Sequence, residues 1–354
     1  MIVDPGRRVR VDDVAARVHA GGPVVDLHND FLVLAAHHRS RRRLSWFADS
    51  YLPRMRGGGI NVEVAAICME GSDPPEGHLR RTLRLLEEAR ALEREHAAVV
   101  VAESAADLDR SLEDGQLALV LALEGIECIG PHLELLDTMY RLGVRCIGLC
   151  HWGRTLYADG SGEDAAGSRL SSVGVAAVQR IWELGLALDL SHLGWRGIDH
   201  VLELGTGPVF ASHSCCRALN DHHRNLSDDH LRAIAASGGV VGVNFLAGFL
   251  RADARATLDD LLDHIEHVAT VAGIDHAAIG SDFIREYMQT RLPDVEPDPV
   301  GGGIEGFEMD PTDLPLVTEG LLDRGLPVDH VRRIMGGNAL RFLRRVLGPG
   351  APRT

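Results

Sequence analysis

The sequence predicts an α/β fold, namely a single (β/α)8 barrel of the TIM type with long βα loops at its carboxyl-terminal face. Three observations lead to this prediction. Short apolar segments rich in β-branched residues alternate about eight times with longer segments of helical period. The apolar segments contain few polar positions, which is typical of parallel strands buried on both faces. No Pro-rich or Ser-rich linker interrupts the alternation.

The strands and helices of this barrel can be placed in chain order. Strands are predicted at 23–27, 60–67, 117–123, 144–149, 185–190, 207–211, 239–245 and 276–281. Amphipathic helices are predicted at 78–97, 171–184, 227–236, 258–272, 313–325 and 328–346. Ser227 is a typical N-cap, and Asp228 and Asp229 place acidic side chains in the first turn that follows. Eight strand-then-helix units are the number that closes such a barrel.

Long connections are expected at the active-site end of the barrel. They follow the first, fourth and eighth strands, at roughly 31–59, 152–170 and 283–311. The βα loops of a barrel gather at the carboxyl ends of the strands, where active sites are built. One domain is expected to span 1–354, with a core at about 22–346 and a tail at 347–354.

The charge argues against nucleic acid and anionic membranes as partners. The 36 basic residues minus the 51 acidic residues give a net charge of −15 at pH 7. No apolar run approaches the roughly 18 residues that span a bilayer. The amino terminus carries charges throughout and lacks the apolar stretch of a signal peptide. The protein is therefore expected in the cytoplasm, without a nucleic-acid or membrane partner.

Two features of the composition narrow the chemistry. The chain contains no Lys, which excludes a Schiff-base lysine, a P-loop lysine and a carbamylated-lysine metal bridge. The 6 cysteines form no CxxC pair and no zinc-finger spacing. They are expected to be reduced, buried thiols. The adjacent Cys215 and Cys216 could instead form a redox switch.

Titratable or metal-competent residues end seven of the eight predicted strands. In chain order they are His28 with Asp30, Glu124, His151, His192, His213, Asn244 and Asp282. The carboxyl ends of barrel strands meet at one face, so these side chains are expected to lie together. A single histidine at a strand end is more often a hydrogen-bonded rim residue, but a set from seven strands is unlikely to arise by chance.

The alternation of side chains along a strand indicates which of them face the barrel interior. Asp26, His28 and Asp30 are expected to share the interior face. Leu27 is then expected to point away from it. Glu124 is expected to continue an interior face of small side chains.

The face of His192 follows from the same rule, because Leu188 and Leu190 lie four and two positions before it and are expected inside the barrel. Three histidines with two carboxylates suit Zn²⁺, with Mn²⁺ or Fe²⁺ as weaker candidates. Five ligands are too many for one tetrahedral site. They suffice for two ions if one carboxylate bridges them, and two ions activate water for hydrolysis.

Several segments together resemble a known family. They are VVDLHNDFL, LALEG, LGLALDLSH, FASHS followed by HHRNLSDD, and IGSDF. The chain resembles the membrane (renal-type) dipeptidase family of zinc peptidases, which belongs to the wider amidohydrolase-like group. The resemblance runs from about Asp26 to the GGNALR segment at 336–341.

The resemblance implies a site with two zinc ions per chain. The implied ligands are His28 and Asp30 on one ion, His192 and His213 on the other, and Glu124 as the bridge. The implied substrate contacts are His151 at the scissile carbonyl and its oxyanion, Arg224 at the free C-terminal carboxylate, and Asp282 for proton transfer and the substrate ammonium. Glu124 would take the place of the carbamylated lysine that this chain cannot supply.

The implied activity is hydrolysis of dipeptides with a free C-terminal carboxylate, by attack of a metal-bridging hydroxide. Family substrates include peptides with a D-residue at the C-terminal position, and a homodimer is common in the family. Two alternatives stay open. The same metal site could hydrolyse another N-acyl amino acid or a biosynthetic amide, or the barrel could be an inactive binding protein.

Some positions depart from the family pattern or allow two interpretations. Leu27 replaces a frequent Gly, and Ile284 replaces the second Asp of the usual GSDFDG run. Arg154 stands where Asn is usual, and is either a contact for an acidic substrate or a solvated loop residue.

Four of the other histidines allow two interpretations. His264 and His267 are three residues apart on a predicted helix, and a solvated face is expected there instead of a metal pair. His222 and His223 either touch the substrate or complete their loop.

Overall fold

The computed structural model describes residues 10–68, 75–205, 207–253, 255–291 and 309–348. Most of the expected tail at 347–354 and the segment 292–308 of the third long loop lie outside these residues. The extent of the domain and of its core therefore stays a prediction.

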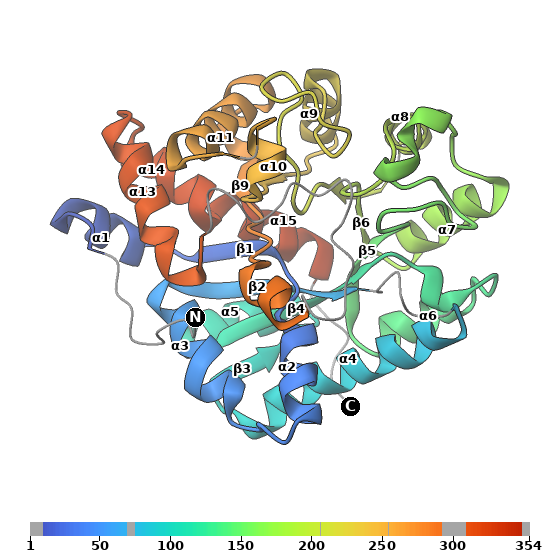
Figure 1. Ribbon diagram of the computed structural model, residues 1–354, viewed down its shortest axis with the longest axis horizontal. Helices are drawn as coiled ribbons and strands as arrows, with labels where there is room; N and C mark the ends of the chain where they lie inside the picture. The colour runs from blue at the N-terminus through green and yellow to red at the C-terminus, as the bar shows by residue number, and fades with distance from the viewer. Residues whose placement is uncertain (1–9, 69–74, 206, 254, 292–308, 349–354) are drawn as a thin grey trace.

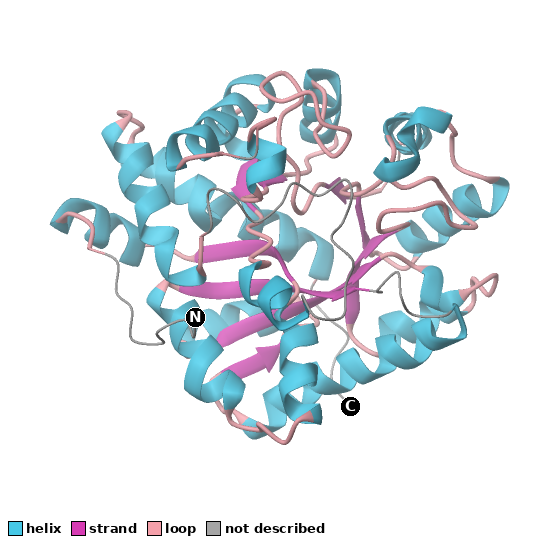
Figure 2. Ribbon diagram, viewed as in Figure 1, coloured by secondary structure: helices cyan, strands magenta, loops and turns pink. Residues whose placement is uncertain are grey.

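A barrel of parallel strands surrounded by helices forms the centre of the molecule (Figure 1, Figure 2). The strands are β1 (Val24–Asn29), β2 (Ile60–Cys68), β3 (Val99–Val101), β4 (Leu117–Glu124), β5 (Val144–Gly148), β6 (Ala187–Asp189), β7 (Val209–Phe210), β8 (Val241–Val243) and β9 (Ala277–Ile279). Eight of them follow the order β7-β6-β5-β4-β2-β1-β9-β8. A parallel bridge between Ala211 and Val241 joins the two ends of this order. The predicted barrel is confirmed.

The helices lie between the strands, as the sequence predicts. They are α1 (Asp13–Ala20), α2 (Phe31–Ser40), α3 (Leu52–Gly57), α4 (Pro75–Glu95), α5 (Ala105–Glu113), α6 (Leu135–Arg141), α7 (Ser172–Glu183), α8 (Trp195–Leu204), α9 (Asp228–Ala236), α10 (Ala247–Leu250), α11 (Leu258–Ala272), α12 (Arg285–Arg291), α13 (Leu314–Asp323), α14 (Val328–Arg332) and α15 (Asn338–Leu347). Ser227 caps α9 by accepting a hydrogen bond from the backbone of His230.

Two details of the predicted organisation are wrong. The first long loop is mostly helical, because it contains α2, a π-helical turn at Phe47–Tyr51 and α3. Its apolar side chains, among them Phe31 and Met55, are buried in the outer core and hold these helices against the barrel. The short strand β3 was not predicted. It pairs only with β4 and lies off the path of the barrel.

Two apolar clusters cover the two faces of the barrel wall. The interior cluster includes Val62 and Val64 of β2, Ala118 and Val120 of β4, and side chains of α15. The outer cluster lies between the strands and the surrounding helices. Since α15 packs at the amino ends of the strands, the carboxyl ends are left for polar side chains.

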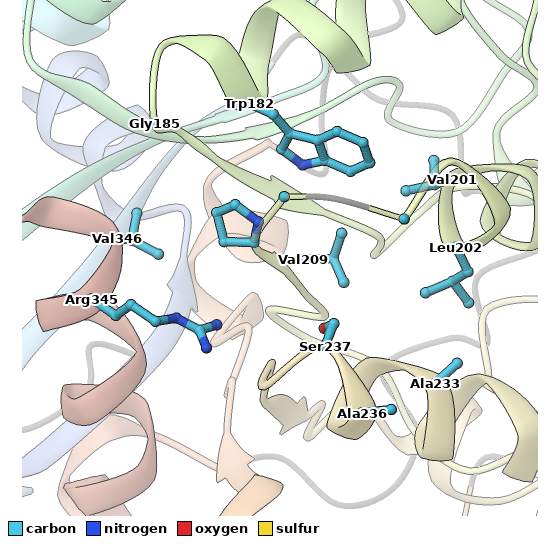
Figure 3. A pocket seen from close by; sticks show the side chains of 13 residues that line it. Trp182, Gly185, Val201, Leu202, Val209, Ala233, Ala236, Ser237, Arg345 and Val346 are labelled. Atoms are coloured by element: carbon cyan, nitrogen blue, oxygen red, sulfur yellow. The ribbon is translucent and has the colours of Figure 1, made fainter.

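A cavity of about 750 Å³ opens at the amino ends of β6 and β7, among α7, α8, α9 and α15 (Figure 3). Its lining is mostly apolar, with Trp182 and Val201 on one side and Arg345 on the other. None of the predicted site residues lines it. This cavity is therefore at the opposite end of the barrel from the candidate site.

The barrel is tightly closed where β7 meets β8 and β9. A Cβ atom added at Gly242 would lie 2.0 Å from the backbone oxygen of Ser212, and one added at Gly280 would lie 1.7 Å from the same atom. Only glycine allows the chain that follows β7 to approach the wall so closely.

We predict that Gly242→Ala lowers the free energy of unfolding by about 1–3 kcal/mol, because the new methyl group must displace backbone. Thermal and denaturant unfolding would measure the loss. Gly153→Ala is the control, since a Cβ there meets nothing within 4 Å. Equal stability of the two variants would contradict the close packing described here.

Candidate metal centre

Glu124 lies at the centre of the polar residues at the carboxyl ends of the strands. It ends β4 and continues the interior face of Ala118, Val120 and Ala122, as predicted. Its Oε1 atom lies 2.9 Å from Nε2 of His192, 3.3 Å from Nε2 of His28 and 3.5 Å from Nε2 of His213. These three imidazoles thus converge on one carboxylate oxygen.

The same region holds further potential ligands. Among the described residues, four groups of three side chains place ligand atoms within 4.8 Å of one another. They are His28–Glu124–His213, Glu124–His151–His192, His28–Asp30–Asp282 and Asp30–Cys68–Glu124. Glu124 belongs to three of the four groups. The structure therefore brings together all five predicted metal ligands, with His151 and Asp282 beside them.

The donor atoms fit a bound cation. Within the described part of the chain, Nε2 of His28, Oδ1 of Asp30 and Oε2 of Glu124 are buried and have no hydrogen-bond partner. Nε2 of His192 and Nε2 of His213 face each other at 2.8 Å. Unpaired polar atoms are costly to bury, and a metal ion coordinated by these atoms would remove that cost.

Burial determines the protonation of these groups. It lowers the pKa of His28 to about 3, and it lowers the pKa of His192 and of His213 well below the usual value. The imidazoles are therefore neutral at pH 7 and keep a lone pair for a metal. Burial raises the pKa of Asp30 to about 7, and repulsion from Asp282 adds to this effect. Burial also raises the pKa of Glu124 well above its usual range.

The orientation of β1 differs from the expectation. Leu27 belongs to the interior cluster, so the prediction that it points away from the interior is wrong. Asp26 pairs in register with Glu63 of β2. The neighbours of Glu63 in β2 face the interior, so Glu63 and Asp26 both lie on the outer face. A register irregularity after Asp26 changes the alternation, and His28 faces Glu124 despite it.

The end of β6 departs from regular alternation as well. Leu188 and Leu190 belong to the outer cluster, so the expected interior face of this strand is wrong. His192 nevertheless points inward, because its backbone adopts a left-handed conformation with φ of 69°. Asp282 also has a positive φ, of 52°. Such conformations cost about 1–3 kcal/mol in a residue other than glycine and are typical of functional sites.

The predicted substrate contacts lie at the edge of this cluster. Nε2 of His151 is 3.9 Å from Oε1 of Glu124, and its side chain is 26% exposed. Asn244 donates a hydrogen bond of 3.0 Å to Asp282. The guanidinium of Arg224 is buried and donates to the backbone oxygen of His213 at 3.2 Å, while its Nε has no partner among the described residues.

Cys68 is a further candidate ligand that the sequence analysis does not include. It is a buried free thiol, as expected, and its sulfur lies within 4.8 Å of ligand atoms of Asp30 and Glu124. Burial raises the pKa of the Cys68 thiol well above its usual value. Cys68 is the last residue of β2, the one predicted strand without a polar terminus. The place of Cys68 at the end of a predicted strand is therefore the sequence signal that could have identified it as a candidate ligand.

For three other residues, the contacts in the structure decide between the interpretations that the sequence allows. His264 is buried in α11, where it accepts from the backbone of Cys216 and faces the carbonyl of Leu250, so its predicted solvated face is wrong. His267 is partly exposed and pairs with Asp228. Arg154 forms a two-pronged ion pair with Asp159.

Cys215 and Cys216 are buried free thiols, as expected. The rings of His222 and His223 stack on each other at 4.3 Å, and that of His222 also lies 4.9 Å from Phe249. Ile284 is half-buried just before α12.

We predict that Asp30→Asn stabilises the metal-free protein at about pH 8 and abolishes most of the stabilisation by added zinc. The folded pKa of Asp30 is about 7, above the usual 3.8, so this group favours folding only at low pH and loses that contribution as the pH rises through 7. Melting temperatures of both proteins from about pH 5 to pH 8, with and without zinc, would measure the effect.

Asp323→Asn, at an exposed position late in α13, is the control for a change of charge alone. If the metal-free Asp30→Asn variant were no more stable relative to the parent at pH 8 than at pH 5, the raised pKa of Asp30, caused by burial and by repulsion from Asp282, would be refuted.

Comparison with known proteins agrees with this geometry. Residues 13–348 match the membrane dipeptidase family, peptidase family M19. An uncharacterized dipeptidase of Schizosaccharomyces pombe is 32% identical over 284 residues, which cover 73% of this chain and 68% of the relative. Dipeptidase verJ of Clonostachys rogersoniana is 31% identical over 355 residues, which cover 93% and 85%.

A solved structure is also similar. It is a metallo peptidase from Rhodobacter sphaeroides liganded with a phosphinate mimic of the dipeptide L-Ala-D-Ala. The match has a TM-score of 0.79 and 27% sequence identity, and covers 92% of this chain and 99% of the other. This chain belongs to the membrane dipeptidase family and is a hydrolase that acts on peptide bonds.

Proposed function

We propose that this dipeptidase binds two zinc ions and cleaves dipeptides that carry a free C-terminal carboxylate. The observation that carries the proposal is the position of Glu124, which shares ligand groups with both His28 and His192. In the proposed arrangement His28 and Asp30 would hold one ion, His192 and His213 would hold the other, and Glu124 would be a ligand shared by both. This donor set of imidazoles and carboxylates suits Zn²⁺.

The chain's own residues would orient the substrate around the metal pair. When bound, the ions would supply an activated water and polarise the scissile carbonyl. His151, partly exposed at the edge of the cluster, would stabilise the negative charge that develops on the carbonyl oxygen. Asp282 would accept a proton and pass it to the departing amine, while Asn244 holds the carboxylate in place.

The guanidinium of Arg224 would bind the free carboxylate of the substrate. Its burial beside the end of β7 fixes its direction, and planar guanidinium groups pair with carboxylates through two parallel hydrogen bonds. We extend the proposal to substrates with a D-residue at the C-terminal position, because the Rhodobacter sphaeroides relative is liganded with a mimic of L-Ala-D-Ala.

Cytoplasmic location and a homodimer stay predictions. Within the described residues, no helix has both the length and the apolar character that crossing a membrane requires.

We predict that the zinc-loaded protein hydrolyses both L-Ala-L-Ala and L-Ala-D-Ala and contains about two equivalents of zinc. Amino-acid release would measure turnover, and elemental analysis would measure the metal. N-acetyl-L-alanine and the amide of L-Ala-D-Ala are the comparison substrates. Cleavage of the N-acyl amino acid but of neither dipeptide would support the alternative substrate class. Well under two equivalents of zinc, with no turnover, would support an inactive binding protein.

We predict that Arg224→Ala and Asp282→Asn affect different kinetic constants. Arg224→Ala should raise KM about 10- to 100-fold, since a hydrogen bond to a charged group contributes about 1.5–3 kcal/mol. Asp282→Asn should lower kcat at least about 100-fold while zinc content is retained, because it removes a proton carrier. Equal loss on the C-terminal amide would refute the role of Arg224. Loss of one zinc would assign Asp282 as a ligand.

A further inference from the structure

Two aspartates, at different places in the barrel wall, each accept three hydrogen bonds in the same pattern. In the first, Oδ1 of Asp189 accepts from the backbone of Ser191 at 3.0 Å and from the backbone of Ser212 at 2.9 Å. Its Oδ2 accepts from the hydroxyl of Ser212. Asp189 ends β6, and Ser212 lies two residues after its partner in β7, Phe210. We call this arrangement the Asp189 clasp.

The second arrangement, the Asp26 clasp, repeats this pattern between β1 and β9. Oδ1 of Asp26 accepts from the backbone of His28 at 3.3 Å and from the backbone of Ser281 at 2.7 Å. Its Oδ2 accepts from the hydroxyl of Ser281. Ser281 again lies two residues after the strand partner, Ile279. Each clasp therefore joins neighbouring strands just before a predicted site residue.

The two clasps differ in one contact. The hydroxyl oxygen of Ser212 lies 2.6 Å from Nδ1 of His213. The hydroxyl of Ser281 donates to Asp26, and within the described part of the chain it contacts no imidazole. The Asp189 clasp thus extends to the side chain of a predicted metal ligand, and the Asp26 clasp does not.

The proton positions at the Asp189 clasp follow from its geometry. A serine hydroxyl has one proton to donate, and the contact with Asp189 is much shorter than the 3.4 Å contact with the hydroxyl of Ser191. The proton of Ser212 is therefore directed at Asp189. The remaining short contact requires Nδ1 of His213 to be the donor.

We propose that Asp189 and Ser212 are positioning residues that hold His213 in the tautomer protonated at Nδ1. The lone pair of Nε2 then faces Nε2 of His192 and Oε1 of Glu124, where a metal would bind. Groups that hydrogen-bond the second nitrogen of a metal-binding histidine fix its tautomer and strengthen the ligand. This inference rests on the proposed metal centre, but the tautomer itself can be measured without metal.

Asp189→Asn tests the proposal with little change in shape. The side-chain oxygen of asparagine can still accept from the two backbone N–H groups, so its amide nitrogen faces Ser212 and donates to it. The hydroxyl of Ser212 must then donate to Nδ1 of His213, and the proton of the imidazole moves to Nε2. The lone pair is lost from the metal side.

The measurement is the long-range proton–nitrogen correlation spectrum of metal-free protein labelled with nitrogen-15 histidine. The signals of His213 are assigned by their loss in His213→Gln. We expect the parent protein to give the Nδ1–H pattern and Asp189→Asn to give the Nε2–H pattern. Zinc affinity, measured by competition with a chelator, should fall about 10- to 100-fold in this variant.

Asp26→Asn is the matched control, because it neutralises the other clasp without touching an imidazole, and it should leave the His213 pattern unchanged. An Nε2–H pattern in the parent protein overturns the proposal, and this readout needs no variant to fold. An unchanged pattern in folded Asp189→Asn also overturns it. The expected tautomers without zinc binding or dipeptide hydrolysis would instead refute the proposed function and leave the clasp in place.

Discussion

Buried carboxylates and neutral imidazoles crowd around Glu124, and this crowding is the constraint on which the rest of the site depends. Burial lowers the pKa of His28 to about 3 and raises that of Asp30 to about 7, so the site holds lone pairs and mutually repelling acids in the same small volume. Without a cation, several of these atoms have no hydrogen-bond partner in the described chain. A fold that maintains this arrangement is suited to binding metal ions.

The barrel maintains the arrangement through irregular backbone at the strand ends. Regular alternation would direct His192 outward, yet its left-handed conformation turns the imidazole toward Glu124. The irregularity in β1 has the same consequence for His28. The clasps of Asp26 and Asp189 join neighbouring strands next to these positions, which provides the surrounding structure that strained residues need.

The two ends of the barrel interior have different roles. The amino ends are closed by apolar contacts with α15 and stabilise the fold. The carboxyl ends carry the titratable groups. Glycines such as Gly242 and Gly280 allow the chain that follows β7 to lie close to the barrel wall. Stability and chemistry are thus separated along the barrel axis, as is general for this fold.

The sequence by itself determined the barrel, the order of its eight strands along the chain and the residues that end them, because apolar period and strand-end chemistry are local signals. It did not determine β3, the helices within 31–59, or the directions of Leu27, Leu188, Leu190 and His264. Those features depend on contacts between segments far apart in the chain. Only the tertiary structure placed Cys68 beside Asp30 and Ser212 between Asp189 and His213, since both arrangements arise where separate strands meet.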